Sequence, residues 1–300
     1  MMRVLVSGAS GLIGSVLQPA LLSAGRSVAK LVRRAPAPDE VQWDPTRPMD
    51  PQKLAGYEAV IHLAGKNIAG RWTEKFKREV RESRVTGTRT LATAAAESFR
   101  QTGMPRVFVA ASATGYYGDR GNEELTEASA PGRGFLADVC QEWEAAAQPA
   151  AKAGVRVVHF RLGVVLAKSG GALKAMLPAF RLGLGGRIGD GRQFMSWVAI
   201  DDVVSAFVFA LSNEPVRGPV NVVASEPVRN AEFVRTLAKT LHRPAIFPLP
   251  AFVVRAALGE MGEALLLASQ RVSPMELEKA RYSFLYPELG PALRHVLGMG

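Results

Sequence analysis

The stretch RVLVSGASGLIGSVLQPALLSAG, residues 3–25, decides the fold of this chain. Its first five residues are an apolar run typical of a buried strand, and its second half carries apolar residues at helical spacing up to a terminal glycine. Between them, Gly8, Gly11 and Gly14 leave the backbone without side chains where the helix begins. A phosphate needs such a bare backbone and the free N–H donors of a helix N-terminus. The stretch therefore predicts a strand, a pyrophosphate-binding loop and a helix, in that order.

Strand and helix patterns alternate on the C-terminal side of this stretch. A long helix is predicted at 73–101 with a break near Gly87, and further strands are predicted at 27–32, 59–65, 106–112, 155–163 and 219–225. Strands that alternate with helices predict an α/β fold with a doubly wound parallel sheet. Together with the glycine loop, this pattern predicts an NAD(P)-binding Rossmann fold.

The alternation weakens after residue 165. Residues 1–165 are therefore predicted to form the dinucleotide-binding Rossmann domain, with return segments near 195–225. Residues 166–300 begin with a glycine-rich loop and continue with mainly helical patterns. We expect a small, mainly helical C-terminal domain there that contacts a substrate or a partner.

The end of the second predicted strand selects between two cofactors. An acidic residue at this position would bind the ribose hydroxyl of NAD. The sequence instead reads LVRR, with Arg33 and Arg34, and the next acidic residue is Asp39. Guanidinium groups pair with a 2′-phosphate, so we expect NADP. The predicted contacts in the glycine loop are Gly8, Ser10, Gly11, Leu12, Ile13 and Gly14.

Composition and charge argue against several other classes of function. The net charge is +10, but the basic residues are scattered and interleaved with glutamates, so we expect no nucleic-acid partner. No apolar run approaches the roughly 18 residues of a membrane helix, and we expect no membrane partner. Cys140 is the only cysteine, which excludes an intrachain disulfide and favours a cytoplasmic location. No metal-ligand spacing appears, so no metal site is predicted.

The hydroxyl-rich segment SATGYYG, residues 112–118, follows the strand predicted at 106–112. The carboxyl edge of a parallel sheet is where ligands bind, so Ser112, Tyr116 and Tyr117 are the candidate catalytic residues. A serine hydroxyl there could hydrogen-bond a carbonyl or hydroxyl of a substrate. The tyrosines could donate to a substrate oxygen or pack at the turn, and both readings stay open.

Motifs along most of the chain resemble a known family. They include HLAG (62–65), ESRVTGTRTL (82–91), FLADVCQEWEAAA (135–147), RLGVVL (161–166) and GGALKAMLPAFRLGLGGRIGDGRQFMSW (170–197). With the glycine loop, they are similar to the extended and atypical short-chain dehydrogenase/reductases, and within these to the epimerase-like family that includes human epimerase family protein SDR39U1. The resemblance implies an NADP-binding Rossmann domain closed by a small helical domain. It also implies cofactor contacts at Leu63, Ala64, Gly65, Glu79, Arg84 and Val164.

The sequence departs from these families at the positions that carry chemistry. Short-chain dehydrogenases use Tyr-x-x-x-Lys for proton exchange, and the matching positions here are Leu136 and Cys140, which we expect to be packing residues. Met195 and Ala199 stand where sugar-nucleotide epimerases carry an arginine and a histidine. We therefore expect an NADP(H)-dependent oxidoreductase with an unidentified small-molecule substrate. The alternatives are a nucleotide-sugar epimerase, or an NADPH-binding regulatory protein that meets a protein partner through its C-terminal domain.

Overall fold

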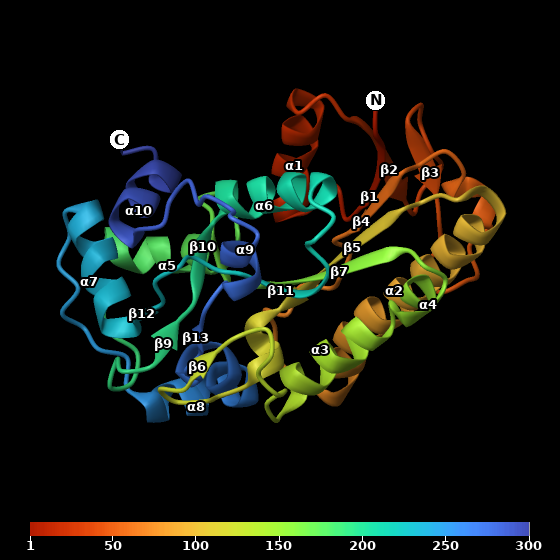
Figure 1. The fold of residues 1–300 in the computed structure, drawn as a ribbon. Helices are drawn as coiled ribbons and strands as arrows, with labels where there is room; N and C mark the ends of the chain where they lie inside the picture. The colour runs from red at the N-terminus through yellow and green to blue at the C-terminus, as the bar shows by residue number, and fades with distance from the viewer. Residues whose placement is uncertain (300) are drawn as a thin grey trace.

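A computed structural model describes residues 1–299, and a seven-stranded parallel sheet lies at its centre (Figure 1). The strand order is β11-β7-β5-β4-β1-β2-β3. The chain runs outward from β1 in one direction and from β4 in the other, so the carboxyl ends of β1 and β4 flank the switch point where ligands bind. The predicted α/β doubly wound sheet is confirmed. The strands are β1 (Arg3–Ser7), β2 (Ser27–Val32), β3 (Glu40–Gln42), β4 (Ala59–His62), β5 (Val107–Ala113), β7 (Arg156–Leu162) and β11 (Gly218–Val222).

Helices cover both faces of the sheet (Figure 1). On one face α1 (Leu12–Ser23) packs beside α6 (Ile200–Ser212), and on the other α2 (Glu74–Thr102) packs beside α3 (Phe135–Ala145) and α4 (Gln148–Lys152). Val4 and Val6 of β1 join the core under α1 and α6, whereas Leu5 joins the core under α2. This double burial explains why the strands read as continuous apolar runs.

Four predicted elements differ from the structure. The strands predicted at 59–65 and 219–225 are shorter, since β4 ends at His62 and β11 ends at Val222. The helix predicted at 73–101 is continuous as α2, because Gly87 is a small residue packed near Pro45 and Trp43 rather than a break. The strand predicted at 155–163 ends at Leu162, and β8 (Val164–Leu166) begins after Gly163. A Cβ on Gly163 would lie 2.3 Å from the carbonyl oxygen of Ser196, so the close approach of a distant segment separates the two strands.

The C-terminal part builds a core of its own, centred on Leu173, Trp197, Phe233 and Leu293. Its helices are α5 (Gly171–Arg181), α7 (Asn230–Leu241), α8 (Ala251–Gly262), α9 (Met275–Lys279) and α10 (Leu289–Leu297). Three short strand pairs join it, namely β8 with β10 (Trp197–Ala199), β9 (Phe194–Met195) with β12 (Val228–Arg229), and β6 (Glu124–Leu125) with β13 (Arg271–Val272). Short turns of other helix types lie at η1 (Pro51–Leu54), η2 (Thr114–Tyr117) and η3 (Glu263–Leu267). Within residues 1–299, every helix is too short or too polar to cross a membrane.

Candidate functional site

Three glycines shape the loop between β1 and α1, and the space available for a Cβ differs among them. Gly8 has a φ of 69°, and a Cβ there would lie 2.7 Å from the carbonyl carbon of Leu63. A Cβ on Gly14 would lie 2.3 Å from the carbonyl oxygen of Gly8. Gly11 is exposed, and the nearest atom to its Cβ would be 3.2 Å away. Gly8 and Gly14 therefore hold the loop in shape, and Gly11 leaves its outer surface bare.

The start of α1 offers hydrogen-bond donors at the same place. Gly11 is the N-cap, no side chain caps the helix, and the first turn carries no acidic residue. The amides of Leu12 and Ile13 therefore point out of the helix end without an intrahelical acceptor. Ser10 is exposed beside them. A pyrophosphate fits this cradle, because it accepts hydrogen bonds and needs the bare backbone of the loop.

Ser7 joins the glycine loop to the end of β4. Its hydroxyl oxygen accepts hydrogen bonds from the amides of Leu63 at 3.2 Å and Ala64 at 3.4 Å. The hydroxyl also shares a hydrogen bond with Nδ1 of His62, 2.6 Å away, and within residues 1–299 the buried Nε2 of His62 has no partner. Burial lowers the pKa of His62 to about 4. Leu63, Ala64 and the following Gly65 are thereby placed beside the cradle, where cofactor contacts are predicted.

The two arginines after β2 have different surroundings. The Arg34 guanidinium pairs with both oxygens of Glu40 at 2.7 and 2.8 Å, and Glu40 lies on the neighbouring strand β3. Hydrogen bonds from the Ala37 amide and from Arg34 lower the pKa of Glu40. Arg33 is exposed and forms no ion pair with any residue in 1–299. Arg33 is therefore the free cation at the position where NADP would carry its 2′-phosphate.

Glu79 and Arg84, both predicted cofactor contacts, lie on α2 and brace the segment after β4. Lys66 and Glu79 form a close ion pair. Nη1 of Arg84 donates to the carbonyl of Lys66 at 2.9 Å and to that of Val80 at 3.2 Å. Its guanidinium also lies 5.1 Å from the ring of Trp143, and burial lowers the pKa of Arg84. These contacts fix the loop that follows Gly65.

Val164 lies at the start of β8. Its amide donates to the carbonyl of Ser196 at 2.8 Å, so the amide is already engaged within the protein. A cofactor at this position can contact the half-buried side chain and the carbonyl of Val164.

Leu136 and Cys140 pack against the end of β5. A Cβ on Gly115 would lie 3.2 Å from Cβ of Leu136 and 3.9 Å from Sγ of Cys140. Cys140 is buried, and its burial raises the pKa of the thiol to about 12. The positions of the family's tyrosine and lysine are thus filled by a packed apolar side chain and a neutral thiol.

A buried ion pair lies one helical turn beyond Cys140. Nε and Nη2 of Arg161 donate to the two carboxylate oxygens of Glu144, each at 2.8 Å, and the side chains are 3% and 13% exposed. The hydroxyl of Ser112 donates to the same carboxylate at 2.8 Å. Ser112 itself is 2% exposed, so the structure places this predicted catalytic residue in the interior.

The two tyrosines pack around the same guanidinium. The Tyr117 hydroxyl donates to Oδ1 of Asn221 at 2.7 Å and accepts from Arg161 at 2.9 Å. Tyr117 is fully buried, and burial raises the pKa of its phenol to about 12. The Arg161 guanidinium lies 3.5 Å from the ring centre of Tyr116, which is half-buried. Asn221 also donates to the carbonyl of Ser273 at 2.9 Å, which ties the network to the C-terminal part.

Glu144, Arg161 and Glu40 contact predicted site residues but were not themselves predicted from the sequence. Two of them carried a local signal. Glu144 follows Leu136 and Cys140 at i+4 spacing, on the same face of α3. Arg161 is a charge between Phe160 and Leu162 at the buried end of β7, and such a charge is rarely buried without a partner.

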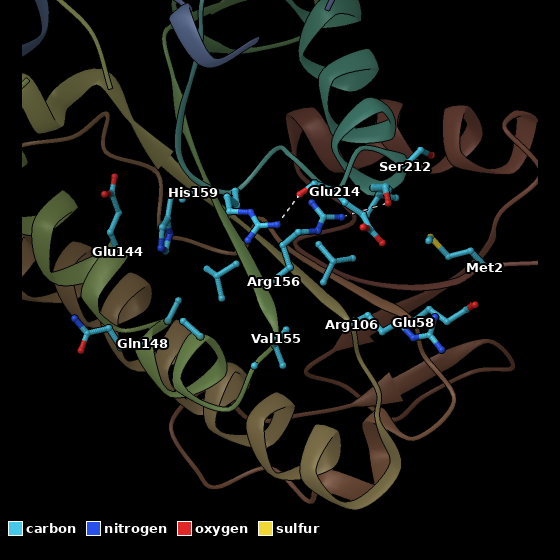
Figure 2. Close-up of a pocket in the computed structure, with 18 of the residues that line it drawn as sticks. Met2, Glu58, Arg106, Glu144, Gln148, Val155, Arg156, His159, Ser212 and Glu214 are labelled. Atoms are coloured by element: carbon cyan, nitrogen blue, oxygen red, sulfur yellow. Dashed lines mark hydrogen bonds between the residues drawn. The ribbon is translucent and has the colours of Figure 1, made fainter. Parts of the chain in front are cut away.

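A cavity of about 950 Å³ opens at the amino ends of β5 and β7 (Figure 2). Arg156 and Arg26 lie in it and donate to the carbonyl of Val216 and the hydroxyl of Ser212, at 2.8 and 2.7 Å, near the end of α6. Ligands of parallel sheets bind at the carboxyl edge, and this cavity lies at the other edge. The cavity therefore lies at the edge opposite the glycine cradle, although Glu144 of the buried ion pair also lines it.

The glycine cradle at the switch point of a parallel sheet defines an NAD(P)-binding Rossmann protein. The chain belongs to the NAD dependent epimerase/dehydratase family, whose model matches residues 4–223. A domain of unknown function, DUF1731, matches residues 249–296. The family resemblance seen in the motifs is confirmed.

Relatives match over nearly the whole chain. Epimerase family protein Mb2239 of Mycobacterium bovis is 43% identical over 97% of this chain and 96% of its own length. Human epimerase family protein SDR39U1 is 38% identical over 99% of this chain and 100% of its own. The crystal structure of human SDR39U1 (isoform 2) with NADPH has a TM-score of 0.90, 37% identity and 99% coverage of both chains. The nucleoside-diphosphate sugar epimerase of Corynebacterium glutamicum has a TM-score of 0.81 and 37% identity, and the match covers 99% of this chain and 58% of that one.

Proposed function

We propose that the protein is an NADP(H)-dependent oxidoreductase of the short-chain dehydrogenase/reductase type, acting on a carbonyl or an alcohol. The observation that carries the proposal is Arg33, an exposed and unpaired cation within residues 1–299, at the end of the strand next to the glycine cradle. A guanidinium pairs with the 2′-phosphate that NADP carries and NAD lacks. The human relative crystallised with NADPH supports the same cofactor for this chain.

The protein itself would bind the cofactor and orient it. The bare backbone at Gly11 and the N-terminus of α1 would hold the pyrophosphate, and Leu63 and Ala64 would line the cofactor at the end of β4. The nicotinamide supplies the hydride chemistry when it is bound. Correct positioning of two reactants can lower a barrier by about 7 kcal/mol or more, so it can sustain turnover without a charged acid–base pair.

The proton of the substrate oxygen would not come from Ser112 or Tyr117. The carboxyl group of Glu144 accepts hydrogen bonds from Arg161 and from the hydroxyl of Ser112, so the O–H of Ser112 is already used. The O–H of Tyr117 is used in the interior in the same way. We assign both as positioning residues at the end of β5. Tyr116 is the phenol left for a substrate, and water or the substrate would exchange the proton.

A substrate panel tests this proposal. Absorbance of NADPH would be followed with aldehydes, ketones and alcohols, and product analysis would detect epimerisation of nucleotide sugars without net change in cofactor. We expect slow turnover, because acid–base assistance is worth about 10²- to 10⁴-fold. Tyr116→Phe should lower kcat without changing NADPH affinity, and Tyr57→Phe, in the core under α2, serves as the control. Unchanged turnover in Tyr116→Phe would contradict the role given to this phenol.

An NADPH-binding regulatory protein without turnover is the second candidate. It is favoured by the buried contacts of Ser112 and Tyr117, which take hydroxyls away from the carboxyl edge of the sheet. Tight NADPH binding, no turnover across the panel, and a protein partner retained only with NADPH would support this candidate against the oxidoreductase.

A further inference from the structure

The C-terminal part exposes a set of large apolar side chains. They lie on two segments, residues 181–189 after α5 and residues 243–252 between α7 and the start of α8. We call them the apolar face. Its members and their exposed fractions are Leu182 (74%), Leu184 (55%), Ile246 (72%), Phe247 (54%), Leu249 (39%) and Phe252 (71%).

Backbone hydrogen bonds fix the two segments against each other. The amide of Phe247 donates to the carbonyl of Gly185 at 3.2 Å, and that of Leu249 donates to the carbonyl of Arg187 at 2.8 Å. A Cβ on Gly186 would lie 1.8 Å from the carbonyl oxygen of Phe247, so the backbones are in close contact. The apolar face is therefore a preformed surface rather than a pair of loose loops.

A groove of about 360 Å³ lies between α7 and residues 245–248. Its walls are apolar, with Val234 and Ala238 on one side and Ile246 and Pro248 on the other, and Arg187 and Arg235 also line it. This groove is an apolar recess that has Arg187 and Arg235 in its lining.

The surroundings of the apolar face are strongly basic. Residues 181–189 and 243–252 contain three arginines and no acidic residue, and α7 adds Arg235 and Lys239 against Glu232. Within residues 1–299, the arginines of this set form no ion pair; they are Arg181, Arg187, Arg235 and Arg243. Unpaired guanidinium groups around an apolar centre favour a ligand that carries carboxylates around apolar side chains.

We propose that the apolar face and its groove bind an acidic, amphipathic segment of a partner protein. Its apolar side chains would cover Ile246 and Phe247 and enter the groove, and its carboxylates would pair with Arg187 and Arg235. Contiguous exposed apolar patches mark interaction sites, and arginine with aromatic residues is the composition of protein interfaces. A second copy of the chain would bring the same positive charge to this face and be repelled. The proposal does not depend on cofactor chemistry.

The test uses the full chain and a fluorescein-labelled peptide of about 15 residues that alternates glutamate with leucine and phenylalanine. Fluorescence anisotropy should show saturable binding that weakens with added salt. The double variant Arg187→Glu/Arg235→Glu, and separately Ile246→Asp, should each weaken binding about tenfold or more. Arg89→Glu, a charge reversal on the exposed surface of α2, should leave it unchanged. NADPH affinity would be measured on every variant. It should stay constant, which would show that each variant is folded and that its cofactor site is intact.

Three results would overturn the proposal. The first is no peptide binding, or equal binding of a matched peptide with lysine in place of glutamate. The second is cosedimentation with phosphatidylglycerol vesicles that Ile246→Asp abolishes, without peptide binding, which would assign the face to a lipid surface. The third is a dimer in light scattering that Ile246→Asp disperses, which would assign the face to a second copy.

Discussion

At the residue scale, Glu144 determines which hydrogen bonds its neighbours can make. Its oxygens accept hydrogen bonds from Arg161 and from the hydroxyl of Ser112, so the Ser112 oxygen keeps only its lone pairs for other partners. The sequence predicted Ser112 as a residue at the sheet edge, and β5 does end there. Its hydrogen-bond partner Glu144 lies 32 positions away on α3. No local sequence pattern identifies which of several glutamates will contact Ser112.

Glu144→Gln should lower the free energy of unfolding by about 3 kcal/mol, because it leaves the buried Arg161 guanidinium without a counter-charge. Urea denaturation measures the change. Glu97→Gln breaks an exposed pair with Arg100 and should cost less than about 1 kcal/mol. Equal effects of the two substitutions would show that the Glu144–Arg161 pair is not the structural element described above.

His62 should make stability depend on pH. Its pKa is about 4 in the folded protein against 6.5 for the free side chain, so the unfolded chain binds the proton more readily. The stabilisation is complete above pH 6.5 and is lost as the pH falls toward 4, by about 3 kcal/mol. The free energy of unfolding of His62→Asn, measured by denaturation between these pH values, should change less steeply with pH than that of the parent. His242→Asn, at an exposed helix end, should keep the parent slope, and identical slopes in all three proteins would refute this account.

At the element scale, β1, the glycine loop and α1 were predictable because each rests on local sequence. The bounds of β1 and β2 agree with the apolar runs at 3–7 and 27–32. The separate strand β8 after Gly163 and the continuity of α2 through Gly87 were not predicted. Both depend on segments brought in by the fold, Ser196 against Gly163 in one case, and Trp43 with Pro45 against Gly87 in the other.

Two glycine substitutions in one loop should separate folding from cofactor binding. Gly14→Ala puts a Cβ 2.3 Å from a backbone oxygen and should lower stability by about 3 kcal/mol or more. Gly11→Ala meets its nearest atom at 3.2 Å, so it should fold but obstruct the pyrophosphate, with a loss of NADPH affinity of about tenfold or more. Thermal unfolding and calorimetry measure the two effects. An undisturbed NADPH affinity in Gly11→Ala would show that the phosphate binds elsewhere.

At the scale of the whole molecule, the α/β class and the family followed from motifs spread along the chain. The charge pairing did not, because Arg34 with Glu40 and Arg161 with Glu144 are set by neighbouring strands and by a helix over the sheet. From the sequence, Arg33 and Arg34 were both predicted to contact the 2′-phosphate. The structure separates them, since Glu40 already neutralises Arg34 and leaves Arg33 for an anionic ligand.

Calorimetric titration of NADPH and NADH into the parent protein, Arg33→Ala and Arg34→Ala tests whether Arg33 selects NADPH. A charge-assisted contact to the 2′-phosphate is worth about 1.5–3 kcal/mol, so the parent should bind NADPH about ten- to a hundredfold more tightly than NADH. Arg33→Ala should remove most of this preference without changing NADH affinity, and Arg34→Ala should have the smaller effect. Equal affinity of the parent for both cofactors, or an unchanged preference in Arg33→Ala, would contradict the account.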